Sequence, residues 1–147
     1  MGSLNVPPSG MVYVDANPVI YSVEKLPVYG PLLQPLWQAA KAKTVEIVSS
    51  ELVVLETLVG PLKAADTVLA DAYEQLFQQP QTRLFRITRT ILRGAARLRA
   101  TTKLKTPDAI HAAAAVNAGC LLFVTNDTDF RGALRIPVII LDDLLAS

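Results

Sequence analysis

The sequence predicts an α/β fold in which helices cover both sides of a mostly parallel sheet of four or five strands. Short runs rich in β-branched and aromatic residues alternate with longer amphipathic runs, an order typical of such folds. One short run, CLLFVT at 120–125, is apolar throughout, as expected of a strand buried on both faces. With 147 residues, of which 51% are hydrophobic, the chain can form one domain with its own core.

In the first half of the chain, the pattern predicts a strand, two helices, a second strand and a third helix. Pro18 suits the first turn of the first helix, and Ser49 and Ser50 offer a cap for the third. The expected ranges, in that order, are 11–14, 18–24, 32–43 with a kink near Pro35, 44–49 and 51–60.

In the second half, the pattern predicts a helix, a strand, two helices and two strands. Thr106 is expected to cap the helix at 107–118, with Pro107 in its first position and Gly119 at its end. The expected ranges are 64–79, 82–88, 89–103, 107–118, 120–125 and 136–141. We expect residues 11–147 to form this single domain and residues 1–10 to be a flexible N-terminal lead.

Three acidic residues are expected to meet at one edge of the sheet. Asp15 follows the first strand directly, and Asp127 lies two residues beyond the strand at 120–125. Asp108 lies in the first turn of the helix that leads into that strand, so it belongs to the same edge. Sites in open parallel sheets form beyond the carboxyl ends of the strands, which makes this edge the candidate site.

Glu56 is a fourth candidate, on the helix predicted at 51–60. Leu52, Leu55 and Val59 fall on one face of that helix, which we expect to be its apolar face toward the core. Glu56 borders this face. Its carboxylate is therefore expected at the edge of the core, near the cleft.

Clustered carboxylates raise one another's pKa unless a cation lies between them. The candidate set contains no cysteine or histidine, so its oxygen donors suit Mg²⁺ or Mn²⁺ rather than thiolate-bound zinc. Such an ion supports the hydrolysis of phosphodiesters. Spacing alone leaves an alternative open, in which Asp108 compensates a helix dipole and Asp127 and Asp129 are turn residues.

Four segments of the chain resemble motifs of the PIN-domain ribonucleases, and most closely those of VapC-type toxins from prokaryotic toxin–antitoxin pairs. The segments are VYVDANPVIYSVE, SSELVVLETL, TPDAIHAAAA and LLFVTNDTDF, in the family's order. The resemblance covers almost the whole chain from Met11. It implies a PIN-like fold, a three-layer α/β/α sandwich, and RNA cleavage that depends on Mg²⁺ or Mn²⁺.

The resemblance also implies which residues act. By position, the family's catalytic and metal-binding acids fall on Asp15, Glu56, Asp108 and Asp127. Polar positions that border the site fall on Asn17 and Thr125, and Asp129 is a further acid, expected outside the metal's own ligands. Pro18 departs from the family pattern, in which an aliphatic residue is more usual, but the acid set is intact.

Two protein partners are expected. VapC-type proteins commonly pair, and the high apolar fraction of this chain also favours a homodimer. The resemblance further implies a cognate antitoxin, a segment of which would lie across the acidic cleft and pair an arginine with its carboxylates.

A basic segment precedes the helix that carries Asp108. Residues 83–105 contain eight of the chain's fourteen basic residues and no acid. Arg89, Arg93 and Arg97 are spaced by four, so they form a stripe on one helix face. Beside a nuclease cleft we interpret this stripe as an RNA-binding surface. The alternatives are a solvated face or a surface for an acidic protein.

His111 is interpreted as a packed residue rather than a general base, because four carboxylates and a metal need no histidine. The single cysteine, Cys120, cannot form an intrachain disulfide, so we expect a reducing, cytoplasmic location. Residues 1–10 lack the apolar segment of a secretory signal, and no apolar run reaches the roughly 18 residues that span a bilayer. We therefore expect no membrane partner.

Two other functions remain open on the sequence. One is a PIN-like RNA-binding or assembly module whose metal site is idle. The other is an unrelated Mg²⁺-dependent phosphatase, because DAN at 15–17 faintly resembles the Asp-x-Asp of haloacid-dehalogenase phosphatases. In this chain the third residue is Asn17, and a lysine-bearing motif in the right context is missing.

Overall fold

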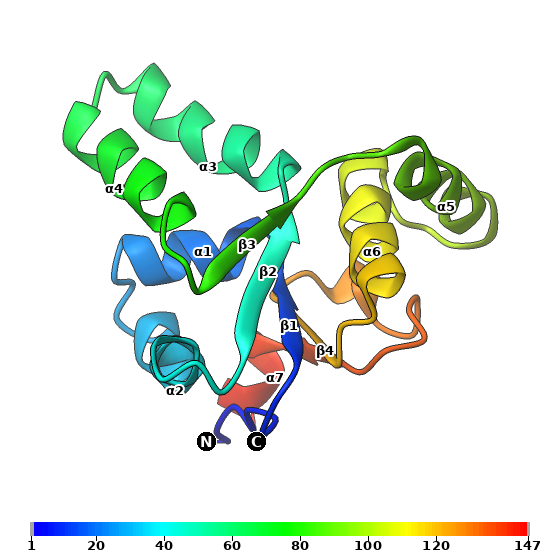
Figure 1. Ribbon diagram of the computed structural model, residues 1–147, viewed down its shortest axis with the longest axis horizontal. Helices are drawn as coiled ribbons and strands as arrows, with labels where there is room; N and C mark the ends of the chain where they lie inside the picture. Colours follow the sequence, from blue (N-terminus) through cyan, green and yellow to red (C-terminus); the bar gives the residue numbers. More distant parts are fainter. Residues whose placement is uncertain (1, 147) are drawn as a thin grey trace.

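Within residues 2–146, which the computed structural model describes, five strands form one parallel sheet in the order β3-β2-β1-β4-β5 (Figure 1). The strands are β1 (Met11–Val14), β2 (Glu46–Ser50), β3 (Thr82–Phe85), β4 (Leu122–Thr125) and β5 (Val138–Ile140). Every neighbouring pair is parallel. The predicted parallel sheet is therefore confirmed.

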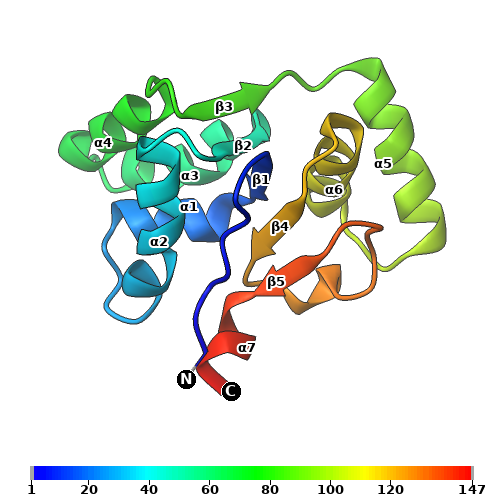
Figure 2. The same ribbon diagram turned by 60° about the horizontal axis from the view of Figure 1, so that its bottom comes forward.

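Helices cover both faces of the sheet (Figure 2). One layer contains α1 (Ala16–Val23), α2 (Tyr29–Lys41), α3 (Leu52–Lys63), α4 (Thr67–Phe77) and α7 (Leu141–Ala146). The other contains α5 (Arg89–Thr101), α6 (Thr106–Ala118) and the short 3-10 helix η1 (Thr128–Phe130). The fold is thus the predicted α/β/α sandwich.

The alternation of side chains along β1 divides the hydrophobic core into two parts. Val12 and Val14 belong to the core beneath α1, α2 and α4, whereas Tyr13 belongs to the core beneath α5 and α6. Tyr13 stacks on Phe123 of β4, with ring centroids 5.1 Å apart. Because β1 is anchored on both faces, the residue that follows it, Asp15, has a firmly held backbone.

α6 packs closely on its surroundings because its buried face is made of small residues. Ala112 to Ala115 are all buried, and a Cβ at Gly94 of α5 would lie 3.3 Å from the Cβ of Ala113. Gly119 ends the helix in the left-handed conformation, with φ of 74°, as predicted.

The predicted cap of α6 is wrong by one residue. Lys105 occupies the N-cap position, and Thr106 is the first helical residue. The Thr106 hydroxyl accepts a hydrogen bond from Arg99 Nη1 at 2.8 Å. Its side chain therefore joins α6 to α5, while Asp108 keeps its predicted place in the first turn.

Other boundaries differ where proline or a buried apolar residue misled the pattern. α2 starts at Tyr29 and contains Pro35, and α3 continues through Pro61 to Lys63. β3 ends at Phe85, three residues earlier than expected. The last apolar run divides, because Leu141 begins α7 although it is fully buried.

Residues 2–10, expected to be a flexible lead, lie against the domain. Leu4 is 5% exposed and belongs to the core beneath α1 and α2. The Gly2 N–H donates to the Leu144 carbonyl at 2.7 Å, and the Gly10 carbonyl accepts from the Glu46 N–H at 2.9 Å. These contacts attach the segment at both of its ends.

No helix among the described residues combines the length and the apolar character needed to cross a membrane.

Candidate metal centre

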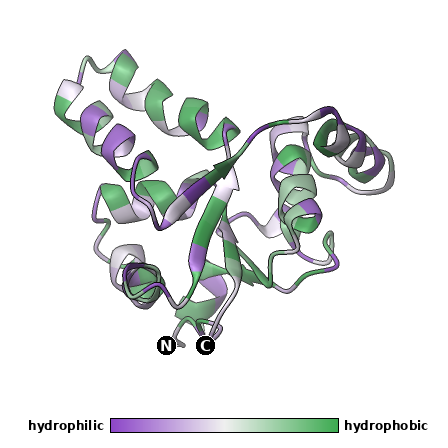
Figure 3. Cartoon of the chain, viewed as in Figure 1, coloured by the Kyte–Doolittle hydropathy of each residue, from purple (hydrophilic) through white to green (hydrophobic). Residues whose placement is uncertain are grey.

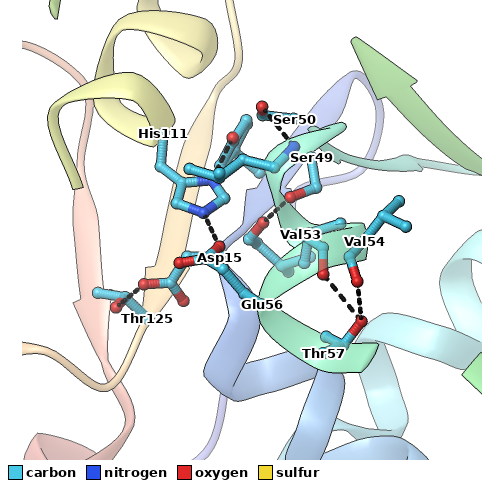
Figure 4. Close-up of polar contacts among 12 residues, drawn as sticks. Asp15, Ser49, Ser50, Val53, Val54, Glu56, Thr57, His111 and Thr125 are labelled. Carbon is cyan, nitrogen blue, oxygen red and sulfur yellow. Dashed lines mark hydrogen bonds and ion pairs between the residues drawn. The ribbon is translucent and has the colours of Figure 1, made fainter. Parts of the chain in front are cut away.

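The candidate site lies at the carboxyl ends of β1 and β4, which are neighbours in the sheet. Asp15 follows β1, and Thr125 is the last residue of β4. The Thr125 hydroxyl donates to Asp15 Oδ2 at 2.6 Å and accepts from the Asp127 N–H at 3.1 Å. Thr125, predicted to border the site, therefore fixes Asp15 (Figure 4). It also fixes the start of the loop that carries Asp127 and Asp129.

Asp15 is an acid in an unfavourable position for a negative charge. It is 6% exposed, and its Oδ1 has no hydrogen-bond partner among the described residues. The pKa of its carboxyl is raised to about 7, chiefly by burial and also by the charges of Glu56 and Asp108, while His111 and Thr125 oppose the rise. A cation next to Oδ1 would supply the missing partner.

Three further carboxylates converge beside the loop after β4. Asp108, Asp127 and Asp129 each offer one oxygen, and these oxygens lie within 4.8 Å of one another. Burial raises the pKa of Asp108, and the charge of Asp127 is the next largest cause. Asp127 Oδ1 also accepts the Asp129 N–H at 2.9 Å, which shapes the turn into η1.

Asp129, expected outside the metal's own ligands, lies close to two of the predicted ligands. It is exposed, yet its carboxylate belongs to the same group as those of Asp108 and Asp127. The turn at Asp127 brings the two side chains together, an effect that sequence spacing does not reveal. Asn17, also predicted at the border, is half-buried in the first turn of α1.

Glu56 reaches the cleft from α3, but the argument that predicted it was wrong. Leu55 and Val59 are 66% and 46% exposed, so the face that contains them points to solvent. The buried face of α3 contains Val53 and Thr57. Hydrophobic residues recur along α3 on more than one side (Figure 3), so periodicity alone could not identify the inward face.

His111 is packed, as predicted, but it also contacts the acid site. It is 1% exposed on α6, and its Nδ1 lies 2.6 Å from the Tyr13 hydroxyl. Its Nε2 lies 2.5 Å from Glu56 Oε1 (Figure 4). Its contact with Glu56 was not predicted from the sequence. One signal in the sequence pointed to such a contact, because a histidine on an otherwise apolar buried face needs hydrogen-bond partners.

The basic stripe lies on α5, away from the core-facing side of that helix. Arg89, Arg93 and Arg97 are all exposed, whereas Ile91 and Ala95 are buried. Within residues 2–146 none of the three arginines forms an ion pair with an acid. Their charges are therefore available to a partner.

The arrangement of acids fits a hard divalent cation. The converging donors are carboxylate oxygens, which suit Mg²⁺ or Mn²⁺. The unpaired, buried Oδ1 of Asp15 is the independent sign that a positive group belongs in the cleft.

The model of the PIN domain family matches residues 12–133, so this chain belongs to the PIN domain family. All four sequence motifs lie within that range. The family assignment replaces the hypothesis of an unrelated phosphatase.

Solved structures with the same fold include proteins from toxin–antitoxin systems. VapBC2 from Rickettsia felis, bound to a promoter DNA fragment, is 18% identical, with a TM-score of 0.70 over 88% of this chain and 98% of that one. A toxin–antitoxin complex from Klebsiella pneumoniae is 22% identical, with a TM-score of 0.65 over 88% and 97%. VapC20 from Mycobacterium tuberculosis, described as a sarcin–ricin loop cleaving toxin, is 18% identical, with a TM-score of 0.68 over 83% and 94%. Among curated protein sequences nothing matched.

The buried carboxyl of Asp15 predicts how stability depends on pH when no metal is present. Its pKa is about 7 in the folded chain against an ordinary value of 3.8, so the folded state binds more protons between these values. The free energy of unfolding therefore falls as the pH rises through that window. We expect Asp15→Asn to remove this loss, which is at most roughly 4 kcal/mol, and to unfold at a higher temperature than wild type in EDTA at about pH 8.

Thermal unfolding followed by circular dichroism measures this difference, and Asp129→Asn is the matched control. Asp129 is exposed, so its neutralisation should change the midpoint much less. The advantage of Asp15→Asn should shrink toward about pH 5, where Asp15 is protonated in the folded wild type. Equal midpoints at the higher pH would contradict the assignment of a buried, unpaired charge.

Proposed function

We propose that this protein is a Mg²⁺- or Mn²⁺-dependent endoribonuclease that acts as the toxin of a toxin–antitoxin pair. The observation that carries the proposal is the convergence of Asp108, Asp127 and Asp129 within 4.8 Å, beside the unpaired buried oxygen of Asp15. Membership of the PIN domain family and the fold shared with VapC20, a toxin that cleaves the sarcin–ricin loop, support RNA as the substrate.

Each acid has a distinct part in the proposed site. Asp108 and Asp127 are half-buried direct ligands, and Asp129 completes their group from the solvent side. Asp15 offers its unpaired, buried Oδ1, while Thr125 holds its other oxygen at 2.6 Å. A divalent cation held by these residues supplies a Lewis acid for phosphodiester hydrolysis.

Glu56 contributes a further carboxylate to the proposed site, from α3. Its charge raises the pKa of both Asp15 and Asp108, so all of these carboxylates share one cleft. The mutual repulsion destabilises the metal-free protein. The same negative charges attract a cation strongly, as the proposed function requires.

The arginine stripe of α5 is the proposed contact for the RNA backbone. Arg89, Arg93 and Arg97 are exposed without acidic partners in residues 2–146, as an electrostatic contact with phosphates requires. Arg97 also lines the groove between α5 and α6. In the proposed function the stripe therefore binds the part of an RNA strand that extends beyond the acid cluster.

We also propose two protein partners, a second copy of the chain and an antitoxin. An antitoxin segment across the acidic cleft would pair an arginine with the carboxylates. α3 extends the same surface, because it carries Glu56 in the cleft and the exposed Leu55 and Leu62 outside it, at 66% and 68% exposure. The fold shared with the Klebsiella pneumoniae toxin–antitoxin complex supports such a partner. Sedimentation of the purified chain distinguishes a homodimer from a species of 15.9 kDa.

Neutralising the acids should abolish metal-dependent RNA cleavage without unfolding the protein. Asp15→Asn and Asp108→Asn keep the side-chain shape but lose the charge that holds the cation, so each should reduce the rate by at least about a hundredfold. Cleavage of a single-stranded RNA is measured with saturating Mn²⁺ and with EDTA.

Asp71→Asn is the control for these variants, because Asp71 is an exposed acid on α4, outside the cluster. It should cleave as wild type does. Expression of the wild-type chain alone should arrest growth of the host, and expression of Asp15→Asn should not. Full cleavage by Asp15→Asn or Asp108→Asn rules out the proposed site, and harmless expression of an active nuclease rules out the toxin role.

Reversing charges in the stripe should weaken RNA binding and its dependence on salt. In Arg93→Glu with Arg97→Glu, each lost phosphate contact should lower the slope of log affinity against log salt by about 0.7 for single-stranded RNA. Binding is measured by fluorescence anisotropy at several salt concentrations, with the inactive Asp108→Asn background preventing cleavage.

Lys41→Glu with Lys43→Glu is the matched control, since both lysines are exposed near the end of α2 and the change in net charge is the same. It should alter binding much less than the α5 variant. Equal effects of the two double variants would mean that net charge alone, and not the stripe, governs RNA binding.

A further inference from the structure

His111 connects the hydrophobic core to the acid cluster through two hydrogen bonds. Its Nδ1 meets the Tyr13 hydroxyl at 2.6 Å and its Nε2 meets Glu56 Oε1 at 2.5 Å (Figure 4). Tyr13 is fully buried and is itself held by stacking on Phe123. A continuous chain of contacts therefore runs from the central strand β1, through α6, to the acid on α3.

The chemistry of Glu56 determines which atom donates in its hydrogen bond with His111. An ionised carboxylate only accepts hydrogen bonds, so Nε2 of His111 must donate to Glu56. In a neutral imidazole the other nitrogen, Nδ1, then accepts from the Tyr13 hydroxyl, and in a protonated ring Nδ1 donates to the Tyr13 oxygen. In either state Tyr13 is the partner of Nδ1 while Nε2 donates to Glu56, so both ring nitrogens are satisfied in a site with 1% exposure.

Glu56 needs such a support because, within residues 2–146, His111 is the one group that forms a hydrogen bond or ion pair with its carboxylate. Its side chain is 24% exposed, and the nearby carboxylates of Asp15 and Asp108 repel it. A flexible glutamate under repulsion would otherwise extend toward solvent, where its charge is hydrated. The ring of His111 cannot move in the same way, because it is 1% exposed and its Nδ1 is hydrogen-bonded to Tyr13 of β1.

We propose that His111 is a positioning residue that holds the Glu56 carboxylate in the acid cleft, and that Tyr13 positions His111. The inference rests on the proposed function of the cleft as a metal site, and it adds two residues outside the acid set. Groups that orient the acids of a metal site typically change metal affinity or activity by about 10- to 100-fold when they are removed.

Calorimetric titration with Mn²⁺ tests this role without relying on activity. We expect His111→Leu to weaken Mn²⁺ binding by about 10- to 100-fold and Tyr13→Phe by about tenfold. His111→Gln keeps an N–H that can reach Glu56, so its affinity should lie between those of wild type and His111→Leu. RNA cleavage by Tyr13→Phe should show a lower kcat with an unchanged KM, because substrate contacts are intact.

Tyr73→Phe is the matched control, since Tyr73 is also a fully buried tyrosine with one hydroxyl partner, Glu24, at the other side of the molecule. It should bind Mn²⁺ as wild type does. The comparison of Tyr13→Phe with Tyr73→Phe remains decisive if His111→Leu does not fold. Equal Mn²⁺ affinity of these two variants and wild type overturns the positioning role while leaving the metal site intact. Failure of wild type to bind Mn²⁺ overturns both the metal site and this inference.

Discussion

Repulsion among carboxylates at the edge of the sheet is the constraint on which the rest of the structure depends. Asp15 is buried with one oxygen unpaired, and the charges of Glu56 and Asp108 oppose its ionisation. Folding must therefore hold these acids together at a cost in stability that the scaffold offsets. In the proposed function a cation enters the cluster and offsets this repulsion.

The scaffold meets that constraint by anchoring β1 in two hydrophobic cores. Val12 and Val14 face one helical layer and Tyr13 faces the other, so the strand that ends at Asp15 has little freedom to move. The hydroxyl of Thr125 then links the ends of β1 and β4. On the opposite side, α5 packs against the alanine face of α6 and leaves its arginines in solvent.

The parts of the site that the sequence predicted are those set by local signals. A strand end, such as the one before Asp15, and a helix start can be found from neighbouring residues, and parallel topology then brings them to one edge. The pairing of Glu56 with His111 joins residues 55 positions apart, so no local pattern contains it. The grouping of Asp129 with Asp127 depends on one side-chain-to-backbone hydrogen bond. For α3, which is apolar on more than one side, only tertiary packing decides which face is buried.

Anomalous X-ray scattering from a crystal equilibrated with Mn²⁺ measures most directly whether the acid cleft holds a cation. We expect a manganese peak bound by carboxylate oxygens of Asp108 and Asp127, close to Asp15 Oδ1, with metal–oxygen distances of about 2.0–2.3 Å. A well-ordered cleft without a manganese peak at saturating Mn²⁺ would contradict this expectation. In that case the acids would have to be explained by helix-dipole and turn interactions alone.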